Sequence, residues 1–123
     1  MAALSYCTLP TSDVAKARAF YDPLLAGIGW GVVMEIPGRG VLYGDGISMI
    51  GLFTPYDGEP ASTGNGAMFG IKFDSTDDAA AFHAKALELG GTCEGAPGER
   101  SPGAFFAYFR DPQGNKLCAY KLG

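Results

Sequence analysis

The sequence AYFRDPQGN at residues 107–115 predicts a β-hairpin near the end of the chain. Apolar and aromatic residues fill positions 104–109, and the run DPQGN at 111–115 collects the residue types that form tight turns. Residues 116–122 then return to a strand-like pattern. We therefore expect two strands, at 104–109 and 116–122, joined by this turn.

An amphipathic helix is expected ahead of this hairpin, starting near Ser75–Thr76. Asp77 and Asp78 fall in its first turn, where the helix dipole favours negative charge. Gly90 and Gly91 supply a stop. The sole histidine, His83, lies beside the apolar stripe, so we expect a surface or partly packed residue and not a metal ligand. The stripe consists of Ala79, Phe82, Ala86 and Leu89.

A similar helix is expected near the start of the chain, with Ser12 as its N-cap. Pro23 would remove one backbone donor from its last turn, and Gly27 and Gly29 would end it. Its apolar face consists of Val14, Ala17, Tyr21, Leu24 and Leu25.

The two helices align at an offset of 62 residues, almost half of the 123-residue chain, which indicates internal duplication. Each half reads β-α-β-β-β, and this predicts an α+β fold of two small sheets that carry a helix on the outer face and together enclose a concave face. We expect one domain over 1–123, with a first module at about 1–54, a linker at 55–66 and a second module at about 67–123. The expected strands are 4–9, 30–36, 41–43 and 48–53, then 67–73, 92–94, 104–109 and 116–122.

Composition excludes several classes of protein. The net charge is −4 and no basic stripe is present, which argues against nucleic-acid binding. The run GISMIGLFT at 46–54, like every other run without charge or proline, is too short to span a membrane, so no membrane partner is expected. The start of the sequence, MAALSYC, lacks the features of a signal peptide, and three cysteines suit a reducing compartment, so a cytoplasmic protein is expected.

The chain resembles the vicinal oxygen chelate superfamily, which includes glyoxalases, bleomycin-resistance proteins and extradiol dioxygenases. The resemblance is carried by TLPTSDV at 8–14, AFY at 19–21, LL at 24–25, LGG at 89–91 and AYFRDPQGN at 107–115. It implies paired βαβββ modules (the glyoxalase/bleomycin resistance/dioxygenase fold), and it implies that the protein forms a homodimer.

The resemblance also implies where a catalytic divalent metal would be held. The four ligand positions fall on Tyr6, Gly51, Gly70 and Cys118. Two of these residues have no side-chain donor, and a phenol with a thiol is not a usual metal-ligand set. We therefore expect no metal and no other cofactor.

Strand alternation predicts which residues share the concave face with these positions. The lining is rich in aromatic residues and methionine, which suits a small molecule that is partly aromatic or anionic. Plain core packing would give the same pattern, and Lys72 would either anchor an anion or extend its amine to water. The candidate ligand-binding residues are Tyr6, Met49, Gly51, Phe53, Met68, Gly70, Lys72, Phe106, Tyr108, Cys118 and Tyr120.

An enzymatic alternative stays open at this point. It is a lyase or isomerase of glyoxalase type, or a dioxygenase, which either depends on a metal or uses Lys72, Tyr6 or Tyr120 as acid or base. The stretch EGAPGERSPG at 94–103 is expected to be a loop, either a lid over the concave face or a hairpin connection.

Overall fold

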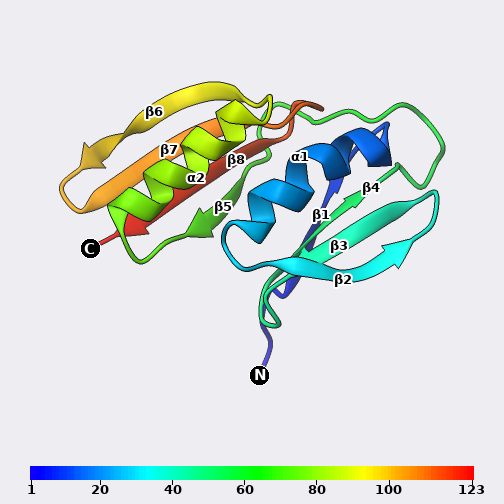
Figure 1. Ribbon diagram of the computed structural model, residues 1–123, viewed down its shortest axis with the longest axis horizontal. Coiled ribbons are helices and arrows are strands. Elements are labelled where there is room, and N and C mark those ends of the chain that lie inside the picture. The colour runs from blue at the N-terminus through cyan, green and yellow to red at the C-terminus, as the bar shows by residue number, and fades with distance from the viewer. The chain divides into compact units, whose positions relative to one another are not determined.

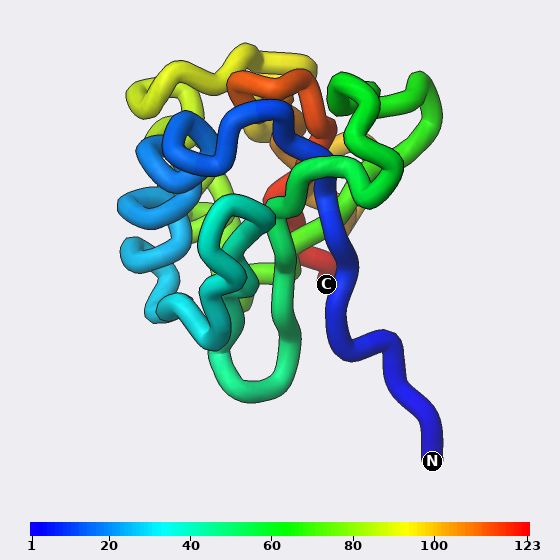
Figure 2. Tube along the Cα trace, turned by 90° about the vertical axis from the view of Figure 1, so that its right-hand side faces the viewer, coloured from blue at the N-terminus to red at the C-terminus, as the bar shows by residue number.

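The computed structural model describes residues 1–123, which form two compact units, Met1–Thr63 and Gly64–Gly123 (Figure 1). Each unit has the element order β-α-β-β-β. Residues 1–5 precede the first strand as a tail without helix or strand (Figure 2). The expected α+β fold of two βαβββ modules, with one helix against each sheet, is confirmed.

The N-terminal unit holds a four-stranded mixed sheet and one helix. The strand order is β1-β4-β3-β2, in which β1 runs parallel to β4 and the other pairs are antiparallel. Figure 1 shows α1 lying across one face of this sheet, against β2, β3 and β4. The elements are β1(Tyr6–Pro10), α1(Val14–Ala26), β2(Gly31–Ile36), β3(Gly40–Gly44) and β4(Met49–Phe53).

The C-terminal unit repeats the arrangement. Its strand order is β5-β8-β7-β6, with β5 parallel to β8 and the other pairs antiparallel. α2 packs on β6, β7 and β8. The elements are β5(Phe69–Lys72), α2(Thr76–Glu88), β6(Thr92–Ser101), β7(Ala104–Arg110) and β8(Lys116–Leu122).

The hydrophobic core of the N-terminal unit lies between α1 and its sheet. The buried helix residues are Ala17, Phe20, Tyr21, Leu24 and Leu25. The face differs from the expected one in that Phe20 joins the core and Val14 is only partly buried. The N-cap is Asp13 and not Ser12: the Asp13 carboxylate accepts from the Lys16 N–H at 3.0 Å. The Ser12 hydroxyl instead accepts from the Ala61 N–H at 3.0 Å, which ties the segment after β4 to the start of α1.

The core of the C-terminal unit buries one polar side chain that the sequence placed nearer the surface. Ser75 caps α2, as expected, and accepts from the Asp78 N–H at 3.0 Å. His83 is only 4% exposed, packs edge-on against Phe109, and its Nε2 lies 3.1 Å from the Tyr108 carbonyl oxygen. Because a carbonyl only accepts, Nε2 carries the proton of this bond.

The stretch at 94–103 is not a loop or a lid. β6 runs from Thr92 to Ser101 and pairs with β7 through three register shifts. Pro97 is tolerated because β6 is the outer strand of its sheet, where an unpaired backbone position is allowed, and bulges absorb the extra residues. No helix in the structure has both the length and the apolar character required to cross a membrane.

Candidate functional site

The sheet of each unit has a face turned away from its helix, which we call its open face. On the N-terminal open face, Tyr6 pairs with Met49 and Thr8 pairs with Gly51 across β1 and β4. Phe53 follows two residues later on β4, so it shares this face with Met49 and Gly51. Tyr6 is 57% exposed, while Met49 and Phe53 are partly buried.

Phe53 fills the space that two glycines leave on the N-terminal open face. A Cβ added to Gly51 would overlap Cε2 of Phe53 and would lie 3.0 Å from its Cδ2. A Cβ added to Gly40, on the neighbouring β3, would overlap the same ring. The glycine at the Gly51 ligand position therefore makes room for an aromatic ring and not for a cavity.

The C-terminal open face carries a row of three nearly parallel rings. Tyr120 on β8 pairs with Phe106 on β7, and their ring centroids are 5.3 Å apart with 11° between planes. Phe106 and Tyr108 are 5.8 Å apart with 8° between planes. All three rings are partly exposed, and we call them the aromatic row.

Gly70 and Cys118 lie side by side next to the aromatic row, on adjacent strands β5 and β8. Gly70 is exposed, and a Cβ there would lie 3.1 Å from Cε1 of Tyr120 and 3.2 Å from the Cys118 sulfur. Cys118 is 2% exposed. Burial raises the pKa of the Cys118 thiol, and the charge of Lys116 offsets part of that rise, so the thiol is a poor nucleophile.

Positive charge is found at both ends of the aromatic row. Lys72 pairs with Tyr120 at one end and is exposed. At the other end the Arg100 guanidinium carbon lies 5.4 Å and the Lys116 ammonium 5.2 Å from the Tyr108 ring centroid. The candidate ligand-binding residues from the sequence include Lys72 but neither Arg100 nor Lys116. Met68, also selected, lies before β5 and is 44% exposed.

The residues at the four implied metal-ligand positions do not fit a divalent ion. Gly51 and Gly70 offer no side-chain donor, which leaves Tyr6 in the N-terminal unit and Cys118 in the C-terminal unit. The Cys118 thiol is held in its neutral form by burial, whereas a metal needs the thiolate. The structure contains no group of three or more His, Cys, Asp and Glu side chains placed to hold a metal ion.

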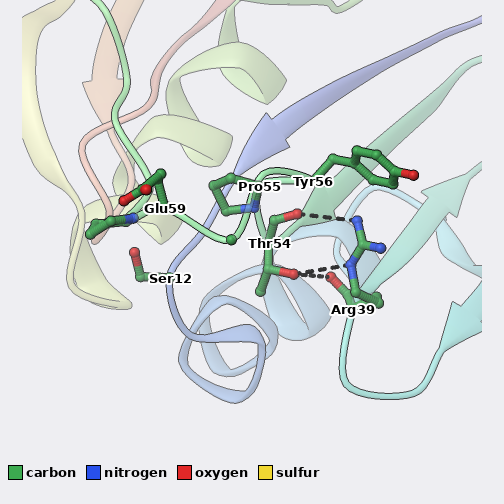
Figure 3. A pocket seen from close by; sticks show the side chains of 8 residues that line it. Ser12, Arg39, Thr54, Pro55, Tyr56 and Glu59 are labelled. Atoms are coloured by element: carbon green, nitrogen blue, oxygen red, sulfur yellow. Dashed lines mark hydrogen bonds between the residues drawn. The ribbon is translucent and has the colours of Figure 1, made fainter.

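A separate pocket of about 510 Å³ lies in the N-terminal unit, where the segment after β4 passes the start of α1 (Figure 3). Arg39 donates to the Thr54 hydroxyl at 3.2 Å and lies over the Tyr56 ring, which is 92% exposed. None of the candidate residues from the sequence lines this pocket. Its lining consists of Ser12, Arg39, Thr54, Pro55, Tyr56, Gly58, Glu59 and Pro60.

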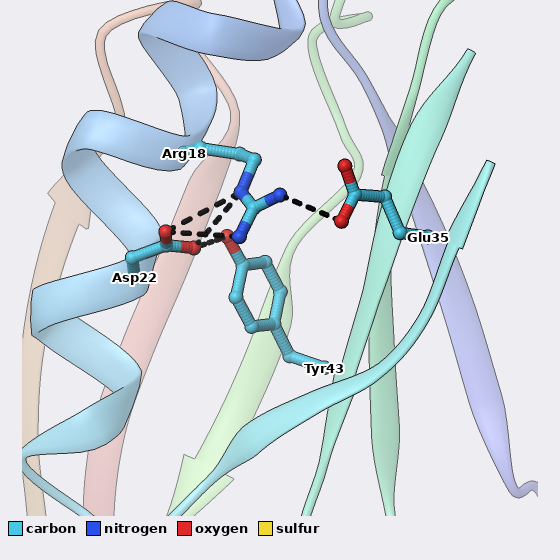
Figure 4. Close-up of polar contacts among 4 residues, drawn as sticks. All are labelled: Arg18, Asp22, Glu35 and Tyr43. Atoms are coloured by element: carbon cyan, nitrogen blue, oxygen red, sulfur yellow. Dashed lines mark hydrogen bonds and ion pairs between the residues drawn. The ribbon is translucent and has the colours of Figure 1, made fainter. Parts of the chain in front are cut away.

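A polar cluster joins α1 to its sheet on the face opposite the N-terminal open face (Figure 4). Arg18 lies between two carboxylates, at 3.2 Å from an Asp22 oxygen and 3.2 Å from a Glu35 oxygen on β2. The Tyr43 hydroxyl donates to Asp22. Burial and then this hydrogen bond raise the pKa of Tyr43 well above its ordinary value, so the phenol is neutral and the cluster holds α1 in place.

Comparison with known proteins gives a match along nearly the whole chain. Residues 3–119 match the family model described as Glyoxalase/Bleomycin resistance protein/Dioxygenase superfamily. A search of curated proteins finds no match.

Solved structures agree with the family model. A glyoxalase/bleomycin resistance protein from Albidiferax ferrireducens T118 is 37% identical, with a TM-score of 0.84 over 95% of this chain and 96% of that one. A glyoxalase/bleomycin resistance protein/dioxygenase family enzyme from Burkholderia phytofirmans PsJN is 21% identical, with a TM-score of 0.80 over 99% of this chain and 100% of that one. A lactoylglutathione lyase from Agrobacterium tumefaciens is 22% identical, with a TM-score of 0.74 over 98% of this chain and 93% of that one.

The Burkholderia and Agrobacterium proteins, at 21% and 22% identity, show only that the fold is shared. Family membership is shown by the family-model match over residues 3–119 and by the 37% identical relative. The chain belongs to the glyoxalase/bleomycin resistance protein/dioxygenase superfamily.

Proposed function

We propose that this protein binds a small molecule with a flat aromatic part and an anionic group, and that it does so without a metal ion. The observation that carries the proposal is the aromatic row of Tyr120, Phe106 and Tyr108 with cations at both ends. The open face that holds this row is our candidate binding surface.

The physical basis is the affinity of exposed rings for another flat ring. Offset-stacked or edge-to-face aromatic pairs contribute about 0.5–1.5 kcal/mol beyond the burial of apolar area. Phe106 is the central ring of the row and stacks with rings on both β7 and β8. We therefore expect its removal to weaken the binding of a stacked ligand most. Gly70, which has no side chain of its own, leaves the neighbouring edge of the Tyr120 ring uncovered by a longer residue at this exposed position.

The donor set supports a metal-free mode of binding. Two of the four implied ligand positions are glycines, and the Phe53 ring covers one of them. A third position holds a buried neutral thiol. These residues do not provide the donors that a Lewis-acid metal centre needs. The enzymatic alternative, a lyase or isomerase of glyoxalase type or a dioxygenase, is an outcome of the test below.

Thermal unfolding in the presence of small aromatic acids, together with elemental analysis of protein purified without chelator, tests the proposal. A ligand at a hundred times its Kd stabilises the folded state by about 2.7 kcal/mol, so 2-naphthoate or a related acid should raise the Tm by several degrees. We expect well below one metal ion per chain and the same shift in Tm with and without chelator. One tightly held metal ion per chain, with ligand binding lost on its removal, would favour the enzymatic alternative.

Two variants test whether the shift in Tm arises from binding at the aromatic row. Phe106→Leu removes the central ring of the aromatic row, and we expect it to abolish the shift in Tm. Phe105→Leu is the matched control, because the neighbouring Phe105 pairs with Lys121 and shares the α2 side of β7 with Ala107 and Phe109. We expect this control to keep the shift.

A further inference from the structure

We propose that Arg100 and Lys116 form an anion subsite against Tyr108, which holds the carboxylate or phosphate group of the ligand. This inference rests on the proposed function and specifies the end of the aromatic row at which the anion binds. Lys72, at the opposite end, is the rival position that the sequence suggested.

Arg100 is fixed over the ring by its own strand. Its Nη1 donates to the Gly98 carbonyl at 2.9 Å and its Nη2 to the Ala96 carbonyl at 2.8 Å. A guanidinium has five N–H donors, so these two bonds leave donors for a ligand. The charge is therefore positioned in advance, which reduces the entropy lost on binding.

Two glycines of β6 make the position of Arg100 possible. A Cβ on Gly95 would lie 2.8 Å from Cδ2 of Tyr108 and 3.2 Å from Nη2 of Arg100. A Cβ on Gly98 would lie 3.3 Å from Nη1 of Arg100. Any other residue at either position would press on the guanidinium or on the ring beneath it.

Lys116 brings a second charge to the same ring without a carboxylate partner. It pairs across the hairpin with Arg110, and Arg110 is the residue that takes the nearby acid, at 2.9 Å from Glu94. Arg110 also donates to the Gly114 carbonyl at 2.8 Å. Neither Arg100 nor Lys116 forms an ion pair.

Four other carboxylates of this unit are held away from Tyr108. Asp111 is buried and accepts from the backbone of the turn that follows it. Glu99 pairs with Phe105 and so belongs to the α2 side of the sheet. Asp77 and Asp78 lie in the first turn of α2. In a chain of net charge −4, two cations that form no ion pair thus lie within 5.4 Å of one ring centroid, where a bound anion is attracted to both charges.

The test uses three probes that share one ring system: 2-naphthoate, 2-naphthyl phosphate and the neutral 2-naphthamide. Each is titrated into the 15N-labelled full chain, and affinity and backbone shifts are followed by NMR. We expect both anions to bind about tenfold more tightly than the amide, as charge-assisted hydrogen bonds imply. Their shifts should centre on Arg100 and Lys116.

Variants separate this subsite from the rest of the face. Arg100→Gln with Lys116→Gln should reduce the anion affinities to that of the amide and leave the amide unchanged. Lys72→Gln, and Lys121→Gln on the α2 side of β8, should keep the tenfold preference. The far-UV circular dichroism of each variant checks its fold, and the shifts at Arg100 and Lys116 in the unaltered chain stand independently of any variant.

Each outcome separates the two proposals. If none of the three probes shifts the open face, the proposed function fails. If all three bind equally, the proposed function stands and the anion subsite is wrong. If the preference for anions is lost in Lys72→Gln and kept in the double variant, the anion binds at the Tyr120 end and this inference is overturned.

Discussion

The ring of Phe53 covers the backbone of Gly51, so that a Cβ at Gly51 would overlap Cε2 of Phe53. The two residues are on the same strand, two positions apart, and share the N-terminal open face. Gly51 stands at an implied metal-ligand position, so a ligating side chain and the present Phe53 ring cannot occupy this face together.

The first prediction concerns this pair. Gly51→Ala should lower the free energy of unfolding by about 1–3 kcal/mol, the range seen when a packed site is overfilled. Phe53→Leu, which frees the space, should remove most of that cost in the double variant. Denaturant unfolding of the unaltered protein, the two single variants and the double variant gives the coupling free energy between the two substitutions. Additive effects would show that the ring does not occupy this position.

The second prediction concerns Tyr43 on the α1 side of the N-terminal sheet. Tyr43→Phe removes the hydrogen bond to Asp22 and should cost about 1 kcal/mol at neutral pH. The folded protein holds the Tyr43 pKa above the ordinary 10.0, so the stability this phenol contributes is present below pH 10 and is lost as the pH rises further. Tyr43→Phe should therefore reduce the alkaline loss of stability. Tyr56→Phe, at an exposed ring, is the control. It should change neither the free energy of unfolding at neutral pH nor its loss at alkaline pH.

The third prediction concerns His83 under α2. Burial lowers the pKa of His83 below 6.5, and the bond to the Tyr108 carbonyl only partly offsets this. The unfolded state therefore binds more protons near pH 6.5, and stability should fall as the pH drops through that value towards the lower folded pKa. His83→Gln should flatten this dependence, measured as the free energy of unfolding between pH 8 and pH 5.5. An unchanged slope in the variant would assign the effect to other groups.

The fourth prediction concerns the three free thiols. Cys93 is exposed, Cys7 partly buried and Cys118 buried with a raised pKa. At pH 8 a disulfide reagent should modify Cys93 rapidly and leave Cys118 unmodified until the chain unfolds. Lys116→Gln should make Cys118 less reactive still, because the charge that lowers its pKa is gone. Mass mapping of the modified sites checks this order, and rapid labelling of Cys118 in the native chain would contradict it.

Much of the fold could be predicted because its signals are periodic. The apolar stripes located both helices, and the DPQGN turn at 111–115 set the register of β7 and β8, in which Tyr108 pairs with Cys118. The expectation of Ser12 as N-cap was wrong, because both residue types cap helices and the hydroxyl of Ser12 instead accepts from Ala61, 49 residues away.

Arg100, at the cationic end of the aromatic row, was missed for a physical reason. Strand alternation assigns residues to a face only while the register is regular, and β6 has three register shifts that place the Arg100 guanidinium over Tyr108. The turn-forming residues of β6 are also typical of a loop, so the sequence did not predict the full strand. Likewise, a glycine in the sequence does not show what lies beside it: a Cβ at Gly51 would overlap the Phe53 ring, whereas a Cβ at the exposed Gly70 would lie 3.1 Å from the Tyr120 ring.

The central claim is that the open face of the β5-β8-β7-β6 sheet binds an aromatic anion and needs no metal ion to do so. The most direct measurement is the affinity of the full chain for 2-naphthoate with excess chelator and then with added Zn²⁺, Mn²⁺, Ni²⁺ or Fe²⁺. We predict one Kd under all of these conditions, with backbone shifts on β7 and β8. Binding that disappears with chelator and returns with one of these metals would contradict the account.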